Sequence, residues 1–191
     1  MNTWILLIIT LILSAFFSGL EIAFITSNKL KIELDKKRGI LNAKILSDFV
    51  KDPSKFISAM LVGNAIALVI YGMASAKIIE NFIHSFIPQF LITDFTILFI
   101  QTLISTFFII TIAEFFPKLL FKINSNYILK MLAVPAYLFY YLLFPFVIIF
   151  TNISKFILSK ILKTKLNKTA LMFNFGDLQT LQLGAALAQI N

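Results

Sequence analysis

Two carboxylates, Glu21 and Glu114, lie inside long apolar segments of this sequence. An ionisable side chain at membrane depth costs roughly 2.5–3.5 kcal/mol or more, so each is a candidate for function. Ser14, Ser18 and Glu21 stand at i, i+4 and i+7, so they form one polar stripe on a helix, and Gly63-Asn64 interrupts the next apolar segment. Carboxylate, hydroxyl and amide oxygens are the hard ligands that Mg²⁺ or Na⁺ accepts. These residue types therefore predict a cation site.

A backbone oxygen adds to this set, because Pro117 follows Glu114 closely. Proline has no N–H and its ring crowds the preceding turn, so it should free the carbonyl of Ala113. With a helical rise of ~1.5 Å per residue, Ser18 and Asn64 lie ~10–12 Å inside the cytosolic boundary. Both carboxylates lie ~6 Å inside the same boundary. Groups from three helices are thus expected in one layer.

Each position also has a structural alternative. Glu114 could form an ion pair with Lys118 at i+4. Ser18 could allow close helix packing, and Asn64 could make an interhelical hydrogen bond. The common depth of these groups favours a site, whereas a structural role is favoured for Glu21. The accessory positions are Glu21, Gly63 and Pro117.

The elements that position these residues are predicted to be transmembrane helices. The chain is 59% hydrophobic, against roughly 45–50% for soluble domains, which indicates an all-α membrane protein. Cysteine is absent and His84 is the only histidine, so thiolate and histidine-built metal sites are excluded. No nucleophile–base set or nucleotide loop is present, and an enzyme is not expected. The net charge of +8 indicates cytosolic loops and anionic lipid headgroups rather than nucleic acid.

Three segments are predicted to span the bilayer, each about as long as one membrane crossing requires. They are Trp4–Ile25, Phe56–Ile79 and Phe95–Phe116. The loop between the first two carries eight basic residues, which places it in the cytosol and the N-terminus outside. A removable signal peptide is not expected, since the start of the chain has neither a basic region nor a cleavage pattern.

Two further regions are predicted to be helical without crossing. Lys29–Phe49 has leucines at helical spacing among charges, which indicates an amphipathic surface helix that Gly39 could interrupt. Asn124–Leu162 contains Pro135 and Pro145, so two or more short helices in the inner leaflet are expected there. The C-terminus is then cytosolic.

Three ordered motifs resemble a known family. They are FFSGLEIAF at 16–24, LVGN at 61–64 and AEFFPK at 113–118. The sequence is similar to the transmembrane domain of the CNNM/CorC family, also labelled haemolysin-C-like, and in particular to Bacteroidetes members, some of which are named for gliding motility. The resemblance covers about residues 3–165. Residues 1–165 are therefore assigned to the transmembrane domain, and 166–191 to a linker stub or an added tail.

The resemblance implies a homodimer in the inner (plasma) membrane, with three spans per subunit and a belt of juxtamembrane helices. It also implies a cytosolic pair of CBS domains in the full-length protein. The family is associated with Mg²⁺ export coupled to Na⁺ entry, and motif position assigns Ser18, Asn64 and Glu114 as ligands. A second Asn often follows the first by four residues, but this chain has Leu68 there, and leucine cannot coordinate a cation.

Two hypotheses follow. The first is a transporter that exports a divalent cation, Mg²⁺ by preference, through a membrane dimer. The second is a membrane scaffold that does not transport, such as an assembly partner in gliding or secretion. Leu68 favours the second hypothesis more than any other residue.

Overall fold

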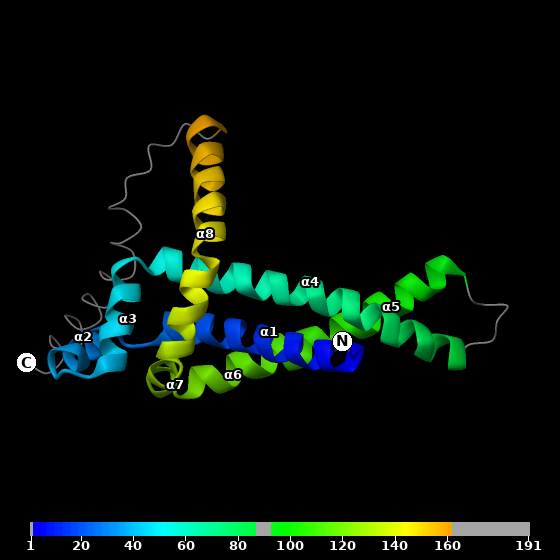
Figure 1. Cartoon of the computed structure of the whole chain (residues 1–191), viewed down its shortest axis with the longest axis horizontal. Helices are drawn as coiled ribbons and strands as arrows, with labels where there is room; N and C mark the ends of the chain where they lie inside the picture. The colour runs from blue at the N-terminus through cyan, green and yellow to red at the C-terminus, as the bar shows by residue number, and fades with distance from the viewer. Residues whose placement is uncertain (1, 87–92, 162–191) are drawn as a thin grey trace, which may run out of the picture. The chain divides into compact units, whose positions relative to one another are not determined.

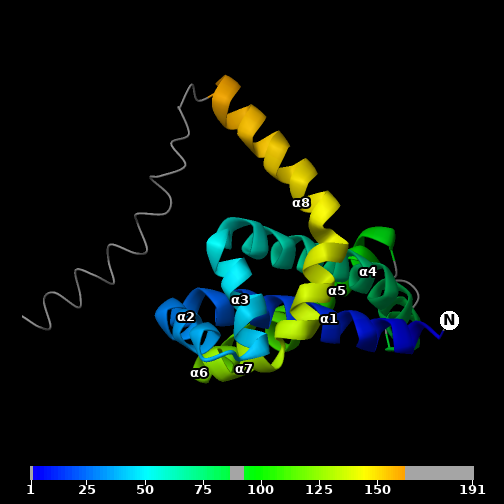
Figure 2. The same ribbon diagram turned by 60° about the vertical axis from the view of Figure 1, so that its left-hand side comes forward.

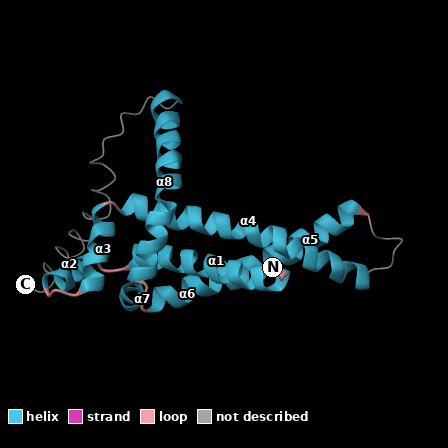
Figure 3. Cartoon of the chain, in the orientation of Figure 1, coloured by secondary structure: helices cyan, strands magenta, loops and turns pink. Residues whose placement is uncertain are grey.

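A computed structural model describes residues 2–86 and 93–161 of the chain. All regular secondary structure in this part is helical (Figure 3), which confirms an all-α membrane protein. The elements are α1 Thr3–Thr26, α2 Lys29–Lys37, α3 Leu41–Lys51, α4 Pro53–Phe86, α5 Asp94–Phe108, the π-helix η2 Ile109–Phe115, α6 Phe116–Ile123, α7 Ser125–Met131 and α8 Ala133–Ile161. The chain divides into two compact units after Ile148, within α8. The helices from α1 to α7 and the first part of α8 belong to the first unit, Met1–Ile148.

The pair formed by α1 and α4 is the axis of this unit, with the two helices side by side (Figure 1). Close approach is possible at two glycines. A Cβ on Gly63 would lie 2.7 Å from the ring of Phe17, and one on Gly19 would lie 2.6 Å from the ring of Phe121. Glycine therefore lets α4 pack closely against the Phe17 ring of α1, and lets the Phe121 ring of α6 pack closely against α1.

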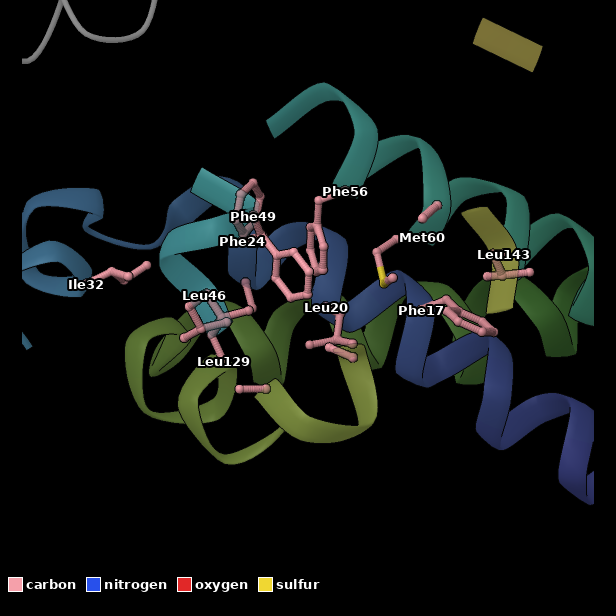
Figure 4. Close-up of a cluster of buried hydrophobic side chains, with 14 of the residues drawn as sticks. Phe17, Leu20, Phe24, Ile32, Leu46, Phe49, Phe56, Met60, Leu129 and Leu143 are labelled. Atoms are coloured by element: carbon pink, nitrogen blue, oxygen red, sulfur yellow. The ribbon is translucent and has the colours of Figure 1, made fainter. Parts of the chain in front are cut away.

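The buried core lies at one end of this pair, where α3 and α7 pack against α1 and α4 (Figure 4). The rings of Phe24 and Phe56 have centroids 4.5 Å apart, and those of Phe49 and Phe56 are 4.4 Å apart. Full burial of each such side chain is worth roughly 1.5–3 kcal/mol. This aromatic cluster fixes the end of the helix pair and so holds the first unit together.

The expected amphipathic helix of Lys29–Phe49 is two helices, α2 and α3. Gly39 has φ 81° and separates them, a backbone conformation that glycine adopts without steric cost. The break also divides the leucine stripe. Leu34 and Leu41 are exposed, whereas Phe49 is buried in the core.

The set of short helices expected over 124–162 is wrong in part. The short helix α7 is present, but α8 runs for 29 residues. Pro135 lies in its first turn, where N–H groups have no intrahelical partner, and Pro145 is accommodated inside the helix. Among the residues that the structure describes, four helices rather than three are consequently long and apolar enough to cross a membrane: Thr3–Thr26, Pro53–Ser85, Asp94–Ile123 and Ala133–Ile153.

Candidate cation site

A polar stripe runs along the buried face of α1. Thr10, Ser14, Ser18 and Glu21 follow one another at spacings of four, four and three residues, which places them on one side of a helix. The first three are 2%, 1% and 0% exposed. Thr10 continues the stripe beyond the residues that the sequence had indicated, although its hydroxyl donates to the Leu6 carbonyl of its own helix.

Asn64 on α4 is bound to this stripe through Ser14, a member of the predicted stripe that was not assigned as a ligand. The Ser14 hydroxyl donates a hydrogen bond of 2.6 Å to Oδ1 of Asn64. Ser18, one turn further along α1, makes no such contact. The stripe indicated that a polar side chain of α1 would meet Asn64. Because the stripe has a polar group at each turn, the sequence does not determine the longitudinal shift between α1 and α4, and so does not identify which group is the partner.

Ser18 is the least satisfied polar group of the site. Its hydroxyl is fully buried and has no hydrogen-bond partner among the described residues. Leaving a buried hydroxyl unpaired costs roughly 1–3 kcal/mol, and natural interiors contain few such groups. An oxygen atom held in this state is available to a ligand.

Glu114 lies in the π-helix η2, which the sequence did not predict. The Phe116 N–H donates to the Thr111 carbonyl, five residues back, and π-helical turns occur frequently at functional sites. Pro117 has no N–H to donate to the carbonyl one turn before it. That carbonyl belongs to Ala113 if the turn is α-helical and to Ile112 if the turn is π-helical. Ala113 is fully buried, and the missing Pro117 N–H removes one hydrogen-bond donor from the carbonyls of this turn.

The charged groups gather where α1 meets η2 and α6. Lys118 Nζ lies 3.9 Å from the Glu114 carboxylate, with 41% and 30% of the two side chains exposed. Glu21 lies within electrostatic range of both. The ion pair considered for Glu114 is therefore formed, at the long end of salt-bridge geometry, and its energy is modest because both groups are partly exposed.

The described residues contain no group of three or more His, Cys, Asp or Glu side chains that could hold a metal. A cation at this site would depend on Glu114 for charge and on neutral oxygens for its other ligands. The structure joins Ser14 to Asn64 and brings Glu114 and Glu21 near one lysine. Gly63 has a packing role, since it admits the Phe17 ring.

Hydrogen bonds and an ion pair join α2, α3 and α7, which lie together in both views (Figures 1 and 2). These helices are at the end of the α1–α4 pair where the buried core lies. Asn126 Oδ1 accepts from the Asn28 N–H at 3.0 Å, and Asn42 Nδ2 donates to the Lys130 carbonyl at 2.9 Å. Lys130 Nζ also donates to the buried carboxylate of Asp35. This hydrogen bond, with the charge of Lys130, lowers the pKa of Asp35. These contacts tie α2 and α3 to α7.

The fold and this polar layer define a multi-pass helical membrane protein with intramembrane oxygen groups. Residues 5–182 match the family described as the Cyclin M transmembrane N-terminal domain, CNNM. The chain therefore belongs to the CNNM family, whose transmembrane domains are associated with divalent-cation transport. A curated relative is the UPF0053 protein YrkA of Bacillus subtilis (strain 168), which is 28% identical over 166 residues, or 82% of this chain. The match spans 38% of the length of that relative.

Proposed function

We propose that this protein exports a divalent cation, Mg²⁺ by preference, with Na⁺ entry as the driving reaction. The observation that carries the proposal is the fully buried Ser18 hydroxyl without a partner among the described residues, on the stripe whose next member is bound to Asn64. Membership of the CNNM family supports the same function. The ligands would be Ser18, Asn64, Glu114 and the Ala113 carbonyl.

The chemistry of these groups suits Mg²⁺. This ion prefers six oxygen ligands at roughly 2.0–2.1 Å and keeps several waters when a protein supplies only a few. Glu114 would provide the negative charge that a dehydrated divalent ion requires in a low-dielectric site. Oδ1 of Asn64 accepts one hydrogen bond from Ser14 and has a second lone pair for the ion.

Orientation and assembly form a second part of the proposal. The basic loop between α1 and α4 supports a cytosolic position for α2 and α3 and an external N-terminus. We infer a homodimer in the plasma membrane, because single-subunit polar stripes leave a cation poorly shielded from lipid. A cytosolic CBS pair in the full-length protein belongs to the same proposal.

A scaffold that does not transport is the second candidate. Two observations favour it. Leu68 stands one turn after Asn64 and offers no oxygen, and Lys118 lies within 3.9 Å of Glu114, where it could neutralise the carboxylate instead of a cation. Under this reading the polar groups only hold the helices together.

Substitution of Glu114 by Gln separates the two candidates. Gln keeps the size of the side chain and removes its charge, so Mg²⁺ at millimolar concentration should protect the unmodified protein from thermal unfolding but not Glu114→Gln. Leu68→Asn should strengthen the protection by adding an oxygen.

The matched control is Lys118→Ala, which breaks the ion pair and leaves the carboxylate in place. It should keep or increase Mg²⁺ protection if Glu114 is a ligand. Equal destabilisation of Glu114→Gln and Lys118→Ala with and without Mg²⁺ would favour the scaffold, as would failure of Mg²⁺ to stabilise the unmodified protein.

A further inference from the structure

The outward surface of α2 and the start of α3 has an unusual combination of side chains for a segment outside the spanning helices. Four apolar residues are exposed there, with Leu41 at 79% and Leu30 at 66%. The group is completed by Leu34 and Ile40. A helix that merely covered a soluble core would show polar groups on this side.

The inner side of α2 is already occupied. Ile32 is 1% exposed in the core, and Asp35 is buried beside Lys130. Leu30 and Leu34, at i and i+4, therefore point away from the protein while Ile32 points into it. The helix has two apolar sides, and only one of them is covered within the described chain.

Lysines that make no direct contact with an acidic side chain lie among these apolar residues, although Lys31 and Lys44 lie within electrostatic range of Asp35 and Asp48. Lys31, Lys37 and Lys44 form no side-chain hydrogen bond or ion pair within residues 2–86 and 93–161, whereas Lys36 is paired with Glu33 and Lys51 with Asp48. The sequence from 29 to 55 has eight basic and four acidic residues. The exposed charge of this surface is consequently positive.

A surface hollow lies at the corner between α2 and α3, with a volume of about 240 Å³. It is lined by Lys36, Gly39, Ile40, Leu41 and Lys44. Two lysines thus line a hollow whose walls are mainly apolar. That arrangement suits a molecule with an anionic head and an apolar body.

We propose that this corner, made of Leu30, Leu34, Leu41, Lys37 and Lys44, is a binding site for anionic phospholipid of the adjacent leaflet. Exposed apolar side chains would enter the headgroup–acyl boundary, and the lysines would contact the phosphates. Helices with this composition lie in the membrane interface, and each lysine near an anionic surface contributes attraction.

The absence of cysteine from the sequence permits a direct test on the whole chain. A single Leu41→Cys carries a bimane fluorophore, and the protein is placed in nanodiscs that contain phosphatidylglycerol and phosphatidylcholine. Bromine is placed near the top of the acyl chains of one lipid or the other. Leu30→Cys, at a second exposed position, provides an independent label site.

Brominated phosphatidylglycerol should quench the label more strongly than brominated phosphatidylcholine, and 0.5 M salt should reduce the difference because it screens the lysines. Lys37→Gln with Lys44→Gln should lower the preference by up to about fivefold for each lysine removed. Lys77→Gln, on α4, is the matched control and should leave it unchanged.

Equal quenching by the two lipids would overturn the proposal, because contact would then be apolar without recognition of the headgroup. Quenching by neither lipid would also overturn it, since the surface would lie off the membrane and face a protein partner instead. A preference that persists in Lys37→Gln with Lys44→Gln would assign headgroup binding to other residues and exclude this corner.

Discussion

The contact between Gly63 and Phe17 can be tested by adding one methyl group. In Gly63→Ala the new Cβ would lie 2.7 Å from two ring atoms of Phe17, so the ring or the helix must move by several tenths of an ångström. Phe17 is 4% exposed and its ring packs against Phe16 and Phe139 at 5.4 and 5.2 Å. Overpacking of such a site costs roughly 1–3 kcal/mol.

Gly72→Ala is a matched control on the same helix, because a Cβ there has no heavy atom within 4 Å. Both variants gain helix propensity of roughly 1 kcal/mol, which cancels when they are compared. Gly63→Ala should therefore unfold with a free energy roughly 1–3 kcal/mol below that of Gly72→Ala. Unfolding by denaturant in mild detergent measures this difference.

Removal of ring atoms provides the complementary test. Phe17→Leu shortens the side chain facing Gly63, so the combination Phe17→Leu with Gly63→Ala should cost less than the sum of the two single changes. Equal stability of Gly63→Ala and Gly72→Ala would refute the close approach of α1 and α4 at Gly63. Strict additivity would show that the Phe17 ring is not what the methyl group meets.

Three further predictions concern α2 and α7, the topology and the oligomeric state. Because Lys130 lowers the pKa of Asp35, the stability from this pair is present above the carboxyl's unfolded pKa of roughly 3.9 and is lost as pH falls through the folded pKa. Asp35→Asn should therefore have a lower free energy of unfolding than the parent at pH 7, and this difference should shrink in acid. A difference that stays constant from pH 7 to pH 3 would contradict the pairing. A cysteine at Lys37 should react only with reagents that reach the cytosol, and one at Ser85 only with external reagents; reversed labelling would disprove the proposed orientation. The protein in mild detergent should have the mass of two chains, and a monomer mass would disprove the homodimer.

The features that depend on apolar periodicity and charge were predicted from the sequence. The first span was expected at Trp4–Ile25 and α1 is Thr3–Thr26, because a continuous apolar run has no competing structure in a bilayer. The break at Gly39 was also anticipated. The family assignment, made from three motifs, is confirmed by the match over residues 5–182.

Other features depend on packing that a single sequence does not display. The length of α8 was missed because proline was weighed by its average cost, although Pro135 occupies a first-turn position where that cost vanishes. The partner of Asn64 is Ser14 and not another residue of the stripe, since the longitudinal shift between α1 and α4 is set by contacts such as Gly63 with Phe17. Residues 166–191, which were assigned to a linker stub or an added tail, lie outside the described part of the chain.

The π-helix has a consequence for how related sequences should be aligned through the third apolar segment. A π turn holds one more residue than an α turn, so η2 acts as a one-residue insertion that the chain absorbs without leaving the helix. Each residue of an α-helix rotates the following ones by ~100°. A deletion of one residue between Ile109 and Phe115 that restored a regular helix would therefore leave α6 facing the same way relative to α5, whereas a regular helix formed without the deletion would turn α6 by ~100°. In a relative with a one-residue gap here, equivalent side chains of α5 and α6 would share alignment columns and face the same neighbours, whereas an ungapped relative with a regular helix would present different side chains to them.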